Sequence, residues 1–206
     1  MKYPYNGKIT YAQVKDMYRQ AGYKFYDQGQ YNINLFGIRN KDLTVVDGFN
    51  DLLGVAYLDE FLNQQCLVFA GTTKPGLIYL KDKLGNPNGT AILIEGFYPK
   101  CWIIGIHNAG KESAHEAYRQ AGPGVFRVHR DNDKDGQFDM TGPVYTDASG
   151  VNGHTTRDFE IMKVGGFSAA CQVVQDDKEH QIWLAIGKRS AELYGNKFSY
   201  ALFREK

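Results

Sequence analysis

The chain has few cysteines, few prolines and no excess of charge of either sign. Of its 206 residues, 3 are Cys and 6 are Pro, and 24 Lys and Arg balance 23 Asp and Glu, giving a formal net charge of +1. Cys66, Cys101 and Cys171 are too few and too widely spaced for a disulfide framework, so at least one thiol is free. A near-neutral chain also lacks the basic surface that binds nucleic acid or anionic membranes. We therefore expect no nucleic-acid partner.

Long apolar runs and several familiar motifs are also missing. No run approaches the ~20 apolar residues of a membrane span, and residues 1–5 lack the apolar core of a signal peptide. These features predict a protein made in the cytoplasm, without a membrane span. The sequence contains no G-x-S-x-G, P-loop or dinucleotide-binding motif. It also has no paired-cysteine zinc motif and no helical His-Glu zinc-protease motif.

Aromatic residues and glycines are plentiful, with 14 Tyr, 12 Phe and 23 Gly, a mixture typical of a β-rich fold with many turns. Apolar alternation and short apolar runs predict strands at 31–35, 66–70, 77–80, 90–94, 101–106, 125–128, 171–174, 182–186 and 198–203, with a further strand end at 45–46 and a strong turn at 85–89. Thr10 looks like the N-cap of an amphipathic helix, and short helices are expected at 112–120 and 190–194. We expect a mainly β (α+β) fold, one domain over residues 1–206, with the N-terminal helix at about 10–22.

An acidic segment resembles the first part of a calcium-binding loop. Asp131, Asp133, Asp135 and Asp139 occupy loop positions 1, 3, 5 and 9, with a glycine at position 6. Gly142 stands where such a loop has its bidentate glutamate, so another group or water must supply that ligand. The two interpretations are a structural calcium site and a solvated acidic turn. No cofactor is otherwise required.

One histidine and one cysteine form the main candidate for catalysis. His154 lies seventeen positions before Cys171, which follows a run of small residues. An imidazole can take the proton of a thiol, and the thiolate can then attack a carbonyl whose oxyanion is held by backbone N–H groups. The N–H groups of Ala170 and Cys171 are candidate donors, and Gly166 is expected in the turn before the strand. Spacing alone favours a simpler interpretation, a buried strand cysteine and an unrelated loop histidine.

The segment around this pair resembles the active-site segment of L,D-transpeptidase-like enzymes, which carry an upstream histidine and a Ser/Thr-x-Gly-Cys motif. The nearest likeness is to an often phage-encoded branch with an N-x-H element, a glycine-containing loop and then W-S-A-G-C-Q-V. The matching residues here are Asn152, His154, Gly165, Gly166, Phe167, Ser168, Ala169, Cys171, Gln172 and Val173. The likeness is specific over residues 151–174, and the run at 130–133 is also similar to that branch.

This resemblance implies a β-rich catalytic domain that acts on the stem peptides of peptidoglycan. Cys171 would be the nucleophile and His154 the base, with Ser168, Ala170, Gly166 and Asn152 as supporting residues. Transfer of the acyl group to an amine makes a cross-link, and transfer to water makes a peptidase. The lack of a signal peptide fits a phage lysis or virion-associated enzyme that acts at the cell wall.

Two departures from the pattern favour a second hypothesis. Ala170 replaces the glycine before the cysteine, and Gly153 replaces an apolar residue before the histidine. The protein could then be an inactive structural or cell-wall-binding protein on the same fold. A third hypothesis is a metal-dependent hydrolase that uses His154, or His129 together with Asp131. Asn152 and Asp158 are both candidates for a third catalytic residue.

Overall fold

The computed structural model describes residues 9–82, 86–158 and 160–206, and it confirms the mainly β class. The helical elements are α1 (Tyr11–Gln20), α2 (Leu77–Lys81), the 3₁₀ turn η1 (Gly165–Phe167) and α3 (Asp177–Tyr194). The strands are β1 (Asn34–Arg39), β2 (Asp51–Leu58), β3 (Gln64–Thr72), β4 (Thr90–Leu93), β5 (Gly96–His107), β6 (His115–Gln120), β7 (Val128–Asp131), β8 (Gly153–Thr155), β9 (Gln172–Val174) and β10 (Phe198–Arg204). In this part of the chain, no helix is long and apolar enough to cross a membrane.

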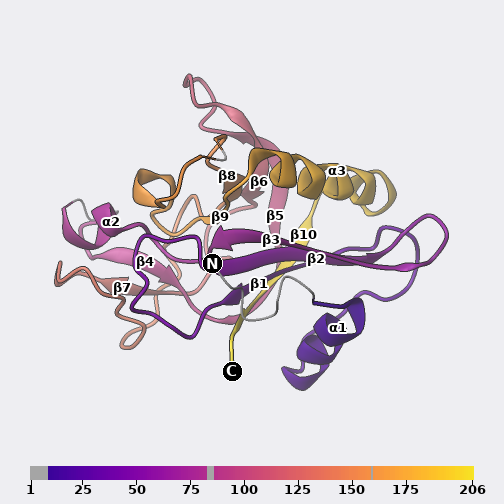
Figure 1. Cartoon of the computed structure of the whole chain (residues 1–206), viewed down its shortest axis with the longest axis horizontal. Coiled ribbons are helices and arrows are strands. Elements are labelled where there is room, and N and C mark those ends of the chain that lie inside the picture. The colour runs from indigo at the N-terminus through magenta and orange to yellow at the C-terminus, as the bar shows by residue number, and fades with distance from the viewer. Residues whose placement is uncertain (1–8, 83–85, 159) are drawn as a thin grey trace.

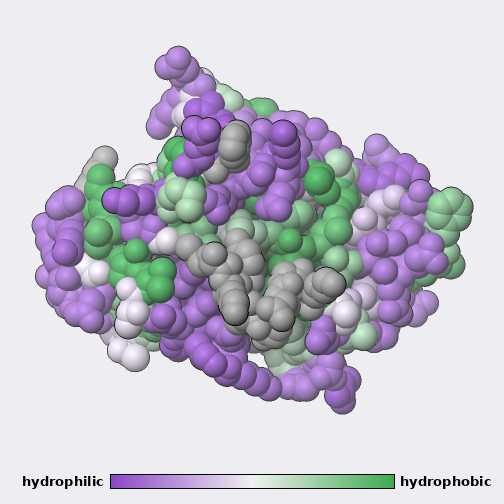
Figure 2. All heavy atoms as spheres, viewed as in Figure 1, coloured by the Kyte–Doolittle hydropathy of each residue, from purple (hydrophilic) through white to green (hydrophobic). Residues whose placement is uncertain are grey.

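Eight of these strands close into a barrel in the order β1-β10-β5-β6-β8-β9-β3-β2, while β4 and β7 form a separate two-stranded sheet. Most neighbours are antiparallel, but β1 pairs with β10 and β8 pairs with β9 in parallel. Figure 1 shows α1 on one side of the barrel and α3 on the opposite side, with α2 beside the small sheet. Figure 2 shows mostly hydrophilic side chains over this face, with apolar groups near its centre and in the region of α2.

Alternation along β1 sends its side chains into two different apolar clusters. In β1, Leu35 packs in the main core with Trp102 and Trp183, whereas its neighbour Phe36 faces the other way and packs with Tyr18 of α1. The α1 prediction is confirmed, including its start. The Thr10 hydroxyl accepts from the backbone N–H of Gln13, whose side chain accepts in return from the Thr10 N–H.

Several sequence predictions are wrong in element type. The run 182–186, predicted as a strand, is part of the long helix α3, which also contains the helix correctly predicted at 190–194. Asp176 caps α3, and the buried residues of this helix recur every three or four positions. Residues 77–80 form α2 instead of a strand, and 45–46 belong to no strand. Within 112–120, predicted as a helix, residues 115–120 form β6, because pairing with β5 outweighs local helix preference.

Other boundaries differ by a few residues. The strands expected at 31–35 and 125–128 begin at Asn34 and Val128. Of the turn predicted at 85–89, residues 86–89 form a turn in which the N–H of Gly89 donates to the carbonyl of Asn86, and residue 85 lies outside the described residues. These shifts have a common cause, since long-range pairing sets where each strand begins.

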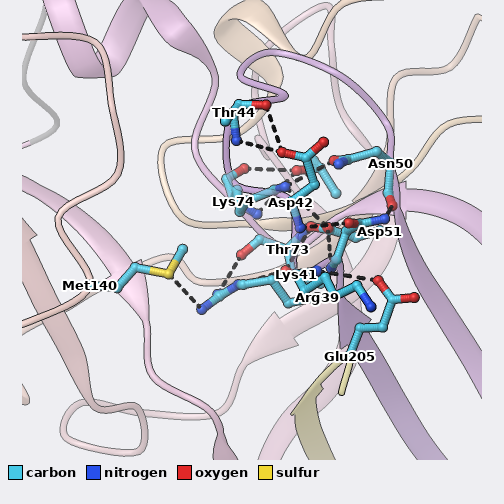
Figure 3. A network of polar contacts seen from close by, with 12 residues as sticks. Arg39, Lys41, Asp42, Thr44, Asn50, Asp51, Thr73, Lys74, Met140 and Glu205 are labelled. Carbon is cyan, nitrogen blue, oxygen red and sulfur yellow. Dashed lines mark hydrogen bonds and ion pairs between the residues drawn. The ribbon is translucent and has the colours of Figure 1, made fainter.

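A buried network of charged groups closes the end of the barrel where β1 and β3 finish and β2 starts. Lys74 Nζ lies 3.2 Å from the Asp51 carboxylate and 2.9 Å from Asn50 Oδ1, and Asp51 also accepts from the backbone N–H of Thr73. Arg39 donates to the Thr73 carbonyl, as Figure 3 shows in close-up. All of these side chains are buried, so each charge depends on its partners in the network.

Candidate active site

The parallel pair of β8 and β9 holds the two residues singled out by the sequence. Gly153 pairs with Gln172 and His154 with Val173. The Gln172 side chain accepts a hydrogen bond from the Tyr200 hydroxyl in the main core. Because side chains alternate along a strand, Cys171 and His154 both lie on the opposite face of this pair. Figure 1 shows β8 and β9 side by side between β6 and β3.

Cys171, the residue immediately before β9, lines a small cavity. Its Sγ lies 3.2 Å from the carbonyl oxygen of Gly150. Burial raises the pKa of the thiol to about 11, and the backbone N–H of Asn152 opposes this by stabilising the thiolate. The cavity holds about 90 Å³ and is lined by Asn86, Ala91, Arg130, Asp147, Ala148, Ser149, Gly150, Val151, Ala169, Ala170 and Cys171. In this conformation the sulfur is therefore a neutral thiol next to a cavity.

The supporting residues hold the backbone on either side of this thiol. Ser168 is fully buried, and its hydroxyl donates to the Cys171 carbonyl at 2.8 Å. The carbonyl of Ser168 accepts from the Gly76 N–H, and that of Gly166 accepts from the Tyr79 hydroxyl. The backbone of Ala170 does not adopt a positive φ. An alanine at this position therefore carries no left-handed strain in this structure.

Gly153 is explained by the packing of two tryptophans. A Cβ atom at this position would lie 3.0 Å from the Trp183 ring and 3.3 Å from the Trp102 ring. A larger residue would have to displace one of these fully buried rings. The glycine therefore makes room for Trp183 on α3, and it does not by itself loosen β8.

His154 is buried and stacked on another histidine. Its ring lies 4.3 Å from the His107 ring at an interplanar angle of 14°. Its Nδ1 is 2.9 Å from the carbonyl of Thr155, which can only accept, so Nδ1 carries the proton. Nε2 is then left with a free lone pair, and no described residue forms a hydrogen bond with it. Burial, reinforced by His107, lowers the pKa of His154 to about 3.

His107, His115, His154 and His180 form what we call the histidine cluster. The His107 ring lies 5.1 Å from His115, and the His115 ring lies 5.7 Å from His154 and 6.1 Å from His180. Asn152 orients the cluster, because its amide donates to His107 Nδ1 while its carbonyl oxygen accepts from a backbone N–H. Burial lowers the pKa of His107 to about 4 and that of His180 to about 3. The rings of His107, His154 and His180 are therefore neutral near pH 7.

Sequence reasoning missed three members of this cluster. His107, His115 and His180 come from β5, β6 and α3, which lie far apart in the chain. Pairing of β5 with β6 places His107 opposite His115, but no local sequence pattern indicates that register. Only a correct alignment of the two strands would have indicated it.

The structure places His154 and Cys171 on one face without a hydrogen bond between them. Cys171 lies two residues before Val173, the residue that pairs with His154. The thiol instead contacts Gly150, and the His154 proton goes to Thr155. Of the two candidate third residues, Asn152 contacts the histidine cluster. Asp158 accepts from the N–H of Glu160 in a local turn.

The acidic segment folds into a compact loop after β7. Carboxylate oxygens of Asp131, Asp133 and Asp139 lie within 4.8 Å of one another, the one such group of three His, Cys, Asp or Glu ligands within the described ranges. The Asp135 side chain instead accepts from the backbone and side chain of Gln137. His129 is not part of this group, and its Nδ1 contacts the Pro143 carbonyl. The histidine cluster likewise does not bring three nitrogens this close.

Comparison with known proteins identified no relative of this chain. No protein-family description, curated protein or solved structure matches the chain.

Proposed function

We propose that this protein is a cysteine-dependent enzyme of the L,D-transpeptidase type that acts on the stem peptides of peptidoglycan. The observation that carries the proposal is the position of Cys171. Its thiol opens on a cavity, and His154 lies on the same face of the adjacent parallel strand. The similarity of residues 151–174 to the phage-type branch adds the substrate class and favours a lysis or virion-associated role.

The charges around the cavity suit an amino acid that carries both a free amine and a free carboxylate. Arg130 and Asp147 line the cavity and form an ion pair of 2.6 Å. The Nε of Arg130 is buried and has no hydrogen-bond partner within the described part of the chain, so the guanidinium keeps an unused donor there. A diamino acid in a stem peptide presents this combination of charges. Arg130 would bind its carboxylate and Asp147 its ammonium group.

The reaction we propose begins with transfer of the Cys171 proton to the free Nε2 of His154. The thiolate then adds to the peptide carbonyl while the N–H groups of Ala170 and Cys171 stabilise the oxyanion. Collapse of this intermediate breaks the C–N bond, and His154 returns the proton to the leaving amine. Water or a second amine next attacks the thioester and releases the thiol. Substrate binding would have to lower the pKa of Cys171 and draw the His154 side chain toward it.

The test is digestion of purified muropeptides, followed by mass spectrometry of the products. We expect wild-type protein to trim or join stem peptides and Cys171→Ala to lose at least 100-fold in rate, on the order of the contribution of a covalent nucleophile. Cys66→Ala is the matched control. This half-buried thiol lies on β3 and packs against the apolar cluster that contains Tyr18 of α1, away from the Cys171 cavity. Equal rates for wild type and Cys171→Ala would refute the proposal.

A cell-wall-binding protein without catalysis is the second candidate. The raised pKa of Cys171 and the absence of a His154–Cys171 hydrogen bond favour it. Such a protein would sediment with purified cell walls but leave muropeptides unchanged. Its Cys171 would also react with iodoacetamide at pH 7.5 no faster than Cys66, whereas an enzyme in which bound muropeptide activates the thiol would show selective, muropeptide-dependent alkylation of Cys171.

A further inference from the structure

The acidic loop, residues 131–139, contains a buried carboxylate for which the described residues provide no counter-ion. The Asp131 side chain ends β7 and is almost fully buried, at 1% exposure. Its Oδ2 accepts from the backbone N–H of Asp139, but its buried Oδ1 has no hydrogen-bond partner among the residues that the structure describes. Such an oxygen is costly unless a cation or donor meets it.

The other carboxylates of the loop increase this cost instead of relieving it. None of the ion pairs in the described part of the chain includes Asp131, Asp133, Asp135 or Asp139. The loop therefore gathers carboxylates around an oxygen for which the described residues provide no partner.

The backbone of the loop turns so that these oxygens converge. Lys134 and Gly136 adopt positive φ values of 62° and 82°, which reverse the chain and bring Asp139 back to Asp131. The loop is also fixed from outside, because Phe138 lies 5.4 Å from the ammonium group of the buried Lys74. Lys81 of α2 packs on Gly136 through its methylene groups. The convergence is thus built into the fold, as in a preformed cation site.

We propose that the acidic loop binds one Ca²⁺ ion through Asp131, Asp133 and Asp139. A hard cation with flexible oxygen coordination fits three carboxylates, and water or backbone carbonyls would complete its shell. Because Gly142 replaces the bidentate glutamate, affinity belongs to the weak class of about 10⁻⁴–10⁻³ M. The ion fixes the end of β7, one residue beyond Arg130, whose side chain lines the Cys171 cavity. This site does not depend on the proposed catalytic function.

Thermal unfolding at pH 7.5 tests the site. After EDTA treatment and buffer exchange, ~10 mM CaCl₂ should raise the Tm by ~3–10 °C, because a ligand that binds only the folded state stabilises it. NaCl of equal ionic strength should give a much smaller shift. Asp133→Asn, at an exposed position, should lose most of the calcium response and keep the fold, while Asp16→Asn on α1 should keep the full response.

The variant Asp131→Asn distinguishes a calcium ligand from a carboxylate with a purely structural role. The neutral amide can still accept from the Asp139 N–H but removes the uncompensated charge. We expect this variant to have a higher Tm than wild type without calcium and to show no calcium response. An unchanged wild-type Tm in calcium, an equal rise in NaCl, or a full calcium response in Asp133→Asn would each overturn the proposal.

Discussion

Acid should unfold this protein through the histidine cluster. The pKa values of His107, His154 and His180 fall from 6.5 in the unfolded chain to about 4, 3 and 3 in the folded protein. At pH 7.5 and above these rings are almost entirely neutral in both states, so their protonation has little effect on stability. Below pH 6.5 the unfolded chain binds protons that the folded protein does not, so stability falls until the pH reaches the folded values.

The size of this effect is large against total stability. The loss from each of the three histidines steepens from about 0.7 kcal/mol per pH unit at pH 6.5, where the unfolded ring is half protonated, toward about 1.4 kcal/mol per pH unit near pH 5. Going from pH 6.5 to pH 5 therefore removes about 5 kcal/mol in total. Asp131 works in the opposite direction, because burial raises its pKa to about 6 and the folded state gains a proton first, and it returns about 1–2 kcal/mol over the same range. The net loss of about 3–4 kcal/mol is a large part of the stability of a marginal domain, typically about 5–15 kcal/mol.

Urea unfolding between pH 7.5 and 5 measures this slope directly. The variant His154→Gln removes one of the titrating groups, so its free energy of unfolding should fall less steeply with decreasing pH, by a difference that approaches about 1.4 kcal/mol per pH unit near pH 5. His129→Gln is the control, since His129 lies on β7 outside the cluster with its Nδ1 at the Pro143 carbonyl, and it should keep the wild-type slope. A wild-type slope near zero, or identical slopes for wild type and His154→Gln, would refute the interpretation that His107, His154 and His180 are buried in their neutral form.

Two further predictions concern packing and buried charge. Gly153→Ala should destabilise the protein by about 1–3 kcal/mol, because its methyl group would press on Trp183 and Trp102. Gly122→Ala, with open space around the new methyl group, should change the free energy of unfolding by less than about 0.5 kcal/mol, and equal effects would contradict the packing argument. Asp51→Asn should cost about 3–5 kcal/mol in urea unfolding, because it leaves the buried Lys74 charge without its carboxylate. A loss below about 1 kcal/mol would show that Lys74 is not charged there.

Local sequence signals were sufficient where a few neighbouring residues decide the structure. Thr10 and Gln13 form the capping box that starts α1, and this could be predicted because both partners lie within one turn. The small residues before Cys171 indicated a turn into a strand, and β9 begins at Gln172. The acidic spacing indicated a loop with converging carboxylates, although Asp135, placed among the ligands by the same spacing, faces Gln137 instead.

Tertiary structure decided what depended on distant partners. Residues 182–186 were predicted as a strand because a short apolar run looks alike in a buried strand and a buried helix. The parallel pairing of β8 with β9 placed His154 and Cys171 on one face, and no spacing rule contains that register. The histidine cluster also depends on β5, β6 and α3 meeting at β8. The sequence by itself therefore determined the β-rich class, the N-terminal helix and the candidate residues, because these follow from local pattern. Which side chains meet was decided by strand register, which only the closed barrel sets.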